Sequence, residues 1–150
     1  IIETIFYGYI FYHFSDKQIL KRVILFFIFF SVLGYCITYL LDNKSPTYFL
    51  NNLIFSGFFL TSIAMVSLYF KFVDSEEILL ISEPAFWVAL GVSLFYSGVS
   101  IAFSLHDFIK ENDLSFFGKK LYHLVQELLS IILYVSISIA LILFRQKNKR

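Results

Sequence analysis

Long apolar segments alternate with short polar connections along the whole chain. A helix that crosses a bilayer needs about 20 mainly apolar residues, and four segments reach that length. A fifth, residues 1–14, is shorter, and we expect it to be the C-terminal part of a spanning helix whose start lies upstream. The pattern predicts an all-α integral membrane helix bundle, with four complete transmembrane helices plus the end of a truncated one. The expected spans of this single membrane domain, residues 1–150, are 23–41, 49–70, 84–105 and 123–144, followed by a tail at 145–150.

Polar side chains line one face of the expected span that begins at Pro84. Spacings of +4, +3, +4 and +3 place five of them on one side of a helix: Ser93, Ser97, Ser100, Ser104 and Asp107. The last span carries a stripe at +4, +3, +4 and +4: His123, Glu127, Ser130, Tyr134 and Ser138. The other two complete spans have such faces as well: Ser31, Tyr35, Thr38 and Asp42, and then Gly57, Thr61 and Ala64. Because helices in lipid associate through small and polar side chains, we expect the serine stripe to be a packing seam that faces protein.

The composition makes lipid the solvent for most of the chain. Hydrophobic residues are 59% of the sequence and charged residues only 15%, against about a quarter in a soluble domain. The net charge is only +1, and the basic residues do not form a surface that could bind phosphates. No nucleic-acid partner is therefore expected. The lone Cys36 excludes an internal disulfide framework and a cysteine-based zinc site. No cofactor is predicted, and no nucleophile elbow, phosphate-binding glycine loop or pair of metal motifs supports an enzyme.

Lysine and arginine are divided unequally between the two sets of connections. In membrane proteins the cytoplasmic connections carry the excess of these residues. One side holds eight of them: Lys17, Lys21, Arg22, Lys71, Arg145, Lys147, Lys149 and Arg150. The other side holds four: Lys44, Lys110, Lys119 and Lys120. The count predicts a cytoplasmic tail, with the 42–48 and 108–122 connections outside.

Ionisable and amide side chains gather at the predicted outer ends of the helices. They are Asp42, Asn52, His106, Asp107, His123 and Glu127. If the stripes of the last two spans face each other, Asp107, His123 and Glu127 meet at an outward-facing mouth. Histidine beside carboxylates changes charge near neutral pH, which suits a small ligand, a cation or protons. These residue types also suit a metal, although no dedicated ligand spacing is present. The alternative is that polar residues gather at any helix end because water is there.

Glu3 is the one acidic residue of the first apolar segment, 1–14. Inside a bilayer an ionisable group is costly and faces protein or water. The alternative is that the end of this segment frays and leaves Glu3 solvated. The sequence leaves both interpretations open.

From Pro84 onward the chain resembles a group of bacterial multi-pass membrane proteins whose activity is uncharacterised. The shared features are Phe86 and Trp87, the step Tyr96-Ser97-Gly98, and Leu121, His123, Ile132, Leu133 and Tyr134 in the last span. Members of that group have six or seven spans and occur near sensor-kinase systems. The resemblance implies a sensory or regulatory module of the bacterial inner membrane. Where such proteins often have asparagines in the last span, this chain has Gln126 and Glu127.

The leading functional hypothesis is a sensory or regulatory membrane module that detects something at its outer face and acts through a partner. The expected partners are the lipid bilayer and a sensor kinase or another membrane protein. One alternative is a small transporter or channel subunit that uses the polar seam as a path. The other is a membrane assembly or scaffold protein.

Overall fold

Helices dominate the structure, a computed structural model that describes residues 2–15, 17–42, 48–74, 80–116 and 119–147. The longer helices are α1 (Ile2–Phe14), α2 (Gln18–Asp42), α3 (Tyr48–Asp74), α4 (Pro84–Ser104) and α6 (Leu121–Lys147). The short elements are η1 (Leu80–Ser82), α5 (His106–Glu111), β1 (Ser115–Phe116) and β2 (Lys119–Lys120). Four of the helices, α2, α3, α4 and α6, are long and apolar enough to cross a membrane, and each contains most of one predicted span.

The helices extend past the predicted spans where the flanking residues favour a helix. α2 begins at Gln18 rather than at Val23, because the intervening Gln, Leu, Lys and Arg residues are good helix formers. For the same reason α6 continues through its basic residues to Lys147. α4 begins with Pro84, whose fixed φ and missing N–H suit the first turn of a helix.

α4 ends before the end of the predicted polar stripe. The helix stops at Ser104, and Leu105 follows with φ −93° and ψ 10°. His106 and Asp107 therefore belong to the next helix, α5. The prediction that Asp107 continues the serine face of one uninterrupted helix is wrong, because the regular spacing does not carry across this break.

The connection between α4 and α6 has structure of its own. After α5 the chain forms a small antiparallel hairpin, in which Ser115 pairs with Lys120 and Phe116 with Lys119. Asp113 enters the hairpin with φ 48°, a left-handed conformation that aspartate tolerates better than most residues. The hairpin leads directly into Leu121, the first residue of α6.

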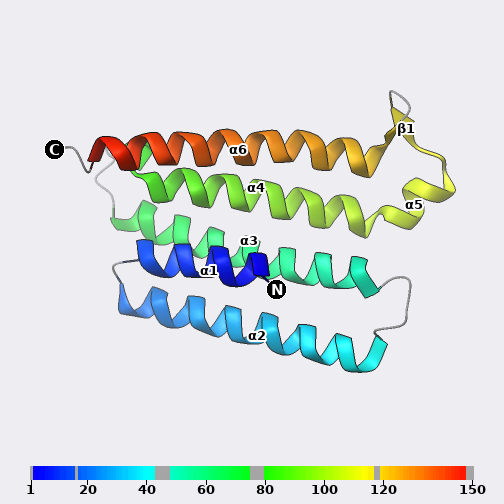
Figure 1. Ribbon diagram of the computed structural model, residues 1–150, viewed down its shortest axis with the longest axis horizontal. Helices are drawn as coiled ribbons and strands as arrows, with labels where there is room; N and C mark the ends of the chain where they lie inside the picture. The colour runs from blue at the N-terminus through cyan, green and yellow to red at the C-terminus, as the bar shows by residue number, and fades with distance from the viewer. Residues whose placement is uncertain (1, 16, 43–47, 75–79, 117–118, 148–150) are drawn as a thin grey trace.

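Four helices lie side by side in the order α2, α3, α4 and α6, and α1 packs against α2 and α3 (Figure 1). The turn between α1 and α2, η1 and the C-terminal end of α6 share one end of the bundle, called here the tail end. α5 and the β1–β2 hairpin lie at the opposite end, called here the hairpin end (Figure 1). Four antiparallel spans in sequence would place alternate connections at opposite ends of the bundle, and the described connections are arranged in this way.

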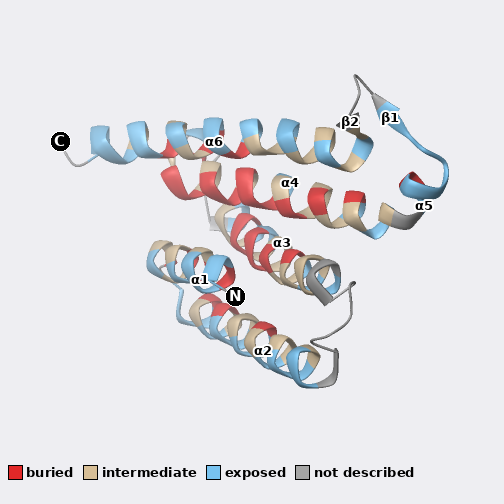
Figure 2. Ribbon diagram, turned by 45° about the vertical axis from the view of Figure 1, so that its right-hand side comes forward, coloured by how far each residue is buried: buried red, intermediate tan, exposed pale blue. Residues whose placement is uncertain are grey.

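α4 is the most buried of the four long helices, and it packs on two opposite faces (Figure 2). On one face a Cβ added to Gly57 of α3 would collide with the Ser100 hydroxyl of α4. On the other face a Cβ added to Gly91 of α4 would lie 2.7 Å from Cβ of Ser136 in α6. Such close approach requires glycine, as is common where helices associate in lipid.

The serine stripe of α4 faces α3 rather than α6. Ser93 is buried, Ser97 and Ser100 are half-buried and Ser104 is exposed. Ser100 lies against Gly57, so the expected packing seam is present, with α3 as its partner. The two predicted polar stripes therefore do not face each other.

α6 meets α4 through a different stripe from the predicted one. Its buried residues are Leu133, Ser136 and Ala140, which repeat at helical spacing along one side. In the predicted stripe Tyr134 is 68% exposed, and Ser138 is also exposed. The Ser138 hydroxyl donates to the carbonyl of Tyr134 at 2.7 Å, within its own helix. The sequence identified small and polar residues correctly but assigned them to the wrong side of α6.

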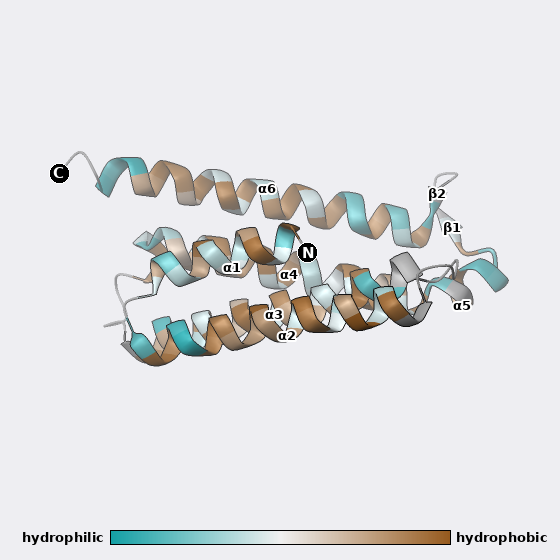
Figure 3. Cartoon of the chain, turned by 60° about the horizontal axis from the view of Figure 1, so that its bottom comes forward, coloured by the Kyte–Doolittle hydropathy of each residue, from teal (hydrophilic) through white to brown (hydrophobic). Residues whose placement is uncertain are grey.

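Apolar side chains cover much of the outer surface of the bundle. α2 exposes a set of large hydrophobic residues: Phe26, Phe29, Phe30, Leu33, Ile37 and Leu40. Apolar residues predominate along the middle of the helices, and hydrophilic residues gather towards the two ends (Figure 3). Such a surface is stable in lipid and would be a liability in water.

We expect Ser136→Leu to destabilise the bundle, because the larger side chain would enter the close contact with Gly91. Overpacking a tight contact costs about 1–3 kcal/mol. Unfolding of the detergent-solubilised protein by added SDS would measure the loss. The matched control is Ser138→Leu, two residues along α6 and exposed. Equal stability of the two variants would contradict the contact between α4 and α6.

Candidate functional site

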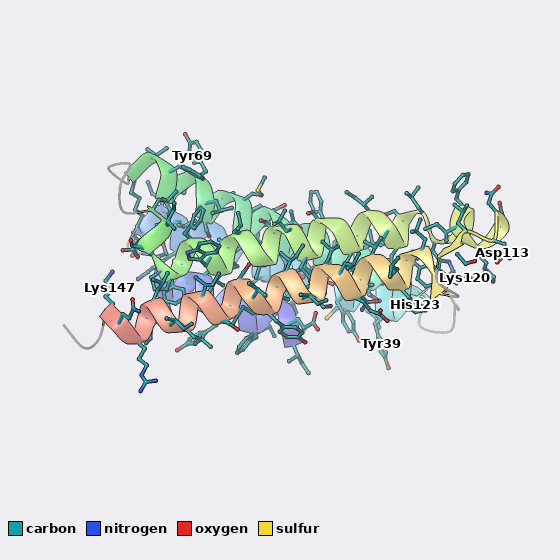
Figure 4. The ribbon with its side chains drawn as sticks, turned by 90° about the horizontal axis from the view of Figure 1, so that it is seen from above. Tyr39, Tyr69, Asp113, Lys120, His123 and Lys147 are labelled. Carbon is teal, nitrogen blue, oxygen red and sulfur yellow. The ribbon has the colours of Figure 1, made fainter. Side chains whose placement is uncertain are left out.

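Imidazole and phenol rings meet at the hairpin end. The centroid of the Tyr122 ring lies 5.0 Å from that of His106 in α5 and 4.4 Å from that of His123 in α6. Figure 4 shows His123 at this end of the bundle and Lys147 at the opposite end. The structure thus brings His106 and His123 to a shared neighbour, Tyr122, which the sequence analysis did not select.

The predicted cluster of Asp107, His123 and Glu127 is only partly described. His123 and Glu127 are both exposed on α6, one turn apart. The side chains of Asp42 and Asp107 lie outside the described residues. Among the described residues, no three His, Cys, Asp or Glu side chains are grouped as a metal site. The three-residue cluster therefore stays a prediction.

Asn52 has an interhelical role. The Thr38 hydroxyl of α2 donates a hydrogen bond of 2.8 Å to Oδ1 of Asn52 in α3. Ser31, two turns earlier on the same side of α2, is buried. A polar pair between helices in lipid contributes about 0.6–2 kcal/mol. This contact gives Asn52 a packing role between α2 and α3, and its role as a ligand stays a prediction.

An ion pair fixes the base of the hairpin. Lys120 Nζ donates to Oδ1 of Asp113, and both side chains are exposed. The hydrogen bond from Lys120, together with the positive charge of that lysine, lowers the pKa of the Asp113 carboxyl. An exposed pair adds little stability. The pair joins the residues on the two sides of the hairpin next to the first turn of α6.

A second polar contact joins α1 to α4, far from both ends of the bundle. The Tyr96 hydroxyl donates a hydrogen bond of 2.8 Å to Oε2 of Glu3. Tyr96 is 4% exposed, and its ring packs edge-on against Tyr7 at 5.8 Å. Glu3 itself is exposed, and the structure agrees with the first interpretation to the extent that one oxygen of its carboxylate is bonded to protein.

Glu3 and Tyr96 lie near the middle of the bundle's length. α4 has 21 residues, which corresponds to about 31 Å and matches a hydrocarbon core of about 30 Å. Tyr96 lies about 18 Å along that axis from Pro84, at the tail end. Glu3 lies about 16 Å from Phe14, where α1 reaches the same end. Two independent counts along the chain thus place the pair at the same depth.

An apolar cleft of about 450 Å³ adjoins this pair. It lies between α1, α4 and α6 and is lined by Tyr7, Phe14, Pro84, Val88, Leu141 and Phe144, among others. Tyr7 links the two features, because its ring contacts Tyr96 and also lines the cleft. The cleft extends from there to the residues of the tail end.

Sequence reasoning did not find the partner of Glu3. In the sequence, Tyr96 stands out only as part of the Tyr96-Ser97-Gly98 step, and nothing there indicates a role for its hydroxyl. The available signal was a lone carboxylate in one apolar segment and a tyrosine in the middle of another. No periodicity connects residues that are 93 positions apart.

Comparison of the chain with protein-family models, with curated proteins and with solved structures found no match. The resemblance to bacterial multi-pass proteins near sensor-kinase systems therefore stays a prediction.

We expect Tyr96→Phe to destabilise the fold by about 0.6–2 kcal/mol, the range for hydrogen bonds between helices in lipid. The variant keeps the buried ring and removes only the hydroxyl, which donates the hydrogen bond to Glu3. Unfolding in mixed micelles would measure the loss. Tyr69→Phe is the control, since Tyr69 is 63% exposed on α3. In a cycle with Glu3→Gln, strictly additive effects would contradict a direct interaction.

We expect Lys120→Met to raise the pKa of Asp113 towards its ordinary value. In the native protein this pKa is lowered, so the pair's contribution is present above the unfolded-state pKa and is lost as pH falls through the folded-state value. An NMR titration of the Asp113 side-chain carboxyl carbon would report the shift. Lys110→Met is the control, because Lys110 is an exposed lysine of the same connection. An unchanged Asp113 pKa in Lys120→Met would refute the assignment.

Proposed function

We propose that this chain is a sensory or regulatory module of the bacterial inner membrane, with its tail end in the cytoplasm, and that it acts through a partner. The observation that carries the proposal is the hydrogen bond from Tyr96 to Glu3 at mid-depth of the bundle. The proposal assigns no catalytic step. It places the moving part of the module at the contact between α1 and α4.

A carboxylate at this depth is costly to keep. A charged group near the centre of a bilayer costs several kcal/mol unless it is paired, and such residues usually serve a function. Thr38 and Asn52 show that two neutral side chains are sufficient for an interhelical hydrogen bond in this protein. Packing alone therefore does not require an ionisable residue at Glu3, whereas a contact that responds to a proton, a cation or a ligand does.

α1 is placed so that it can respond to this contact. It packs mainly against α2 and α3 and makes fewer contacts with α4. Towards α4 and α6 it borders the apolar cleft over much of its length. Loss of the Glu3–Tyr96 bond would thus leave the contact between the Tyr7 and Tyr96 rings and the apolar packing of Phe11 to hold α1 near α4. A helix with two arrangements of similar energy is the kind of element on which membrane switches depend.

In this proposal a movement of α1 reaches the partner at the tail end. α1 turns directly into α2 there, and the turn is held by a hydrogen bond of 3.3 Å from the Ser15 hydroxyl to the carbonyl of Lys17. A shift of α1 would therefore move the start of α2. This end also carries Arg145 and Lys147, and Lys147 Nζ lies 3.0 Å from Glu83 Oε1. A cytoplasmic partner, such as a sensor kinase, would bind this surface.

A transport function has less support. The serine stripe, which was the expected path, is closed by the contact between Ser100 and Gly57. Ser93, Ser97 and Ser104 donate to carbonyls of their own helix. A row of hydroxyls bonded in this way, against a packed neighbour, is typical of a seam rather than of a conduction path.

The proposal predicts that Tyr96→Phe changes the position of α1 relative to α4. Spin labels on cysteines at Ile5 in α1 and Ile101 in α4, both exposed, would report the distance in lipid nanodiscs, with Cys36 replaced by serine. We expect a shifted or broader distance distribution in Tyr96→Phe, because the only change is loss of the bond to Glu3.

A second label pair separates movement of α1 from general unfolding. Met65 in α3 and Ile101 in α4 are both exposed, on helices that pack closely, so their distance should not change. Tyr69→Phe should leave both distances unchanged. If the distance between α1 and α4 is the same in Tyr96→Phe as in the native protein, the switch is refuted, and a scaffold role becomes the better account.

A further inference from the structure

We infer that the cleft between α1, α4 and α6 binds an acyl chain of an anionic phospholipid, whose headgroup lies at the basic tail end. The inference concerns what fills the cleft, and it holds whether or not α1 moves. It rests on the shape and lining of the cleft and on the charge at one end of it.

The lining of the cleft suits hydrocarbon. Val88, Ile137, Leu141 and Phe144 contribute aliphatic and aromatic surface from α4 and α6, and Ile10 does so from α1. The volume of about 450 Å³ falls in the range of sites for small molecules, about 300–1,000 Å³.

The charge around the cleft is asymmetric along its length. At mid-depth it ends beside Tyr7, next to the Glu3–Tyr96 pair. At the tail end it is lined by His13 and Phe144, and Arg145 follows Phe144 in the last turn of α6. Glu83, the acidic residue that precedes Pro84, has its carboxylate paired with Lys147.

This arrangement favours a phospholipid that lies parallel to the helices. Its acyl chain would fill the cleft, and its phosphate would lie at the level of Arg145. Basic residues at the cytoplasmic surface attract anionic lipids, and basic pockets between helices bind their headgroups. A zwitterionic lipid of the same chain length would gain the apolar contact but less of the electrostatic attraction.

Native mass spectrometry of the purified full chain in non-ionic detergent tests the inference. Phosphatidylglycerol and phosphatidylcholine with identical acyl chains would be added separately, and the lipid-bound fraction measured. We expect phosphatidylglycerol to bind about fivefold more tightly, the effect of one basic residue at an anionic headgroup. Arg145→Gln should remove this preference, whereas Lys110→Gln at the hairpin end should keep it. Equal binding of the two lipids by the native chain would overturn the inference.

A matched pair of substitutions on α6 tests the place of binding. Leu141 lines the cleft and is 64% exposed, whereas its neighbour Ile142 is 58% exposed and is not part of the lining. Leu141→Trp should weaken binding of both lipids, because the larger ring occupies the space of the chain, and Ile142→Trp should not. Both positions are exposed, so folding should be retained. Equal lipid binding by the two variants would overturn the inference. So would a dimer of the native chain that Leu141→Trp abolishes, since a second copy would then be the occupant.

Discussion

Close packing on two opposite faces of α4 is the interaction on which the rest of the structure depends. Without a hydrophobic driving force between helices in lipid, association requires surfaces that approach closely. Gly57 allows Ser100 to reach α3, and Gly91 allows Ser136 to lie against α4 from the other side. The order of the four long helices follows, because α4 joins α3 to α6, and α2 joins the row through α3. α1 packs mainly against α2 and α3, and its side towards α4 and α6 borders the cleft.

The sequence predicts the spans well because hydropathy is a local property. Each long apolar segment can be located from its own residues, and four long helices lie where these segments were predicted. The rotation of each helix depends on its neighbours and is not local. α4 carries small residues on two faces, and α6 carries both a polar stripe through Tyr134 and the buried stripe through Ser136. Spacing alone cannot decide which face meets which helix, and the condition that the two polar stripes face each other is not met.

For the candidate site, too, local features could be predicted from the sequence and contacts between helices could not. The gathering of polar residues at one end could be predicted, and the structure adds that Tyr122 lies beside both His106 and His123. The partner of Glu3 could not be predicted, since Tyr96 is distant in sequence and its hydroxyl has no motif around it. The sequence does indicate that a carboxylate in an apolar segment is energetically costly. An acidic residue in an apolar segment needs a partner, even when the partner cannot be named.

The contact between Glu3 and Tyr96 and the cleft beside it have Tyr7 as a common neighbour. The Tyr7 ring packs edge-on against Tyr96 on one side and lines the cleft on the other. A chain that fills the cleft would press on this ring and restrict it, and an empty cleft would leave it room to turn. Because the Tyr96 hydroxyl must point at Glu3 to donate its hydrogen bond, the freedom of the neighbouring ring bears directly on that bond. If an acyl chain fills the cleft, as inferred above, its binding and the hydrogen bond to Glu3 would involve the same short part of α1, between Glu3 and Tyr7.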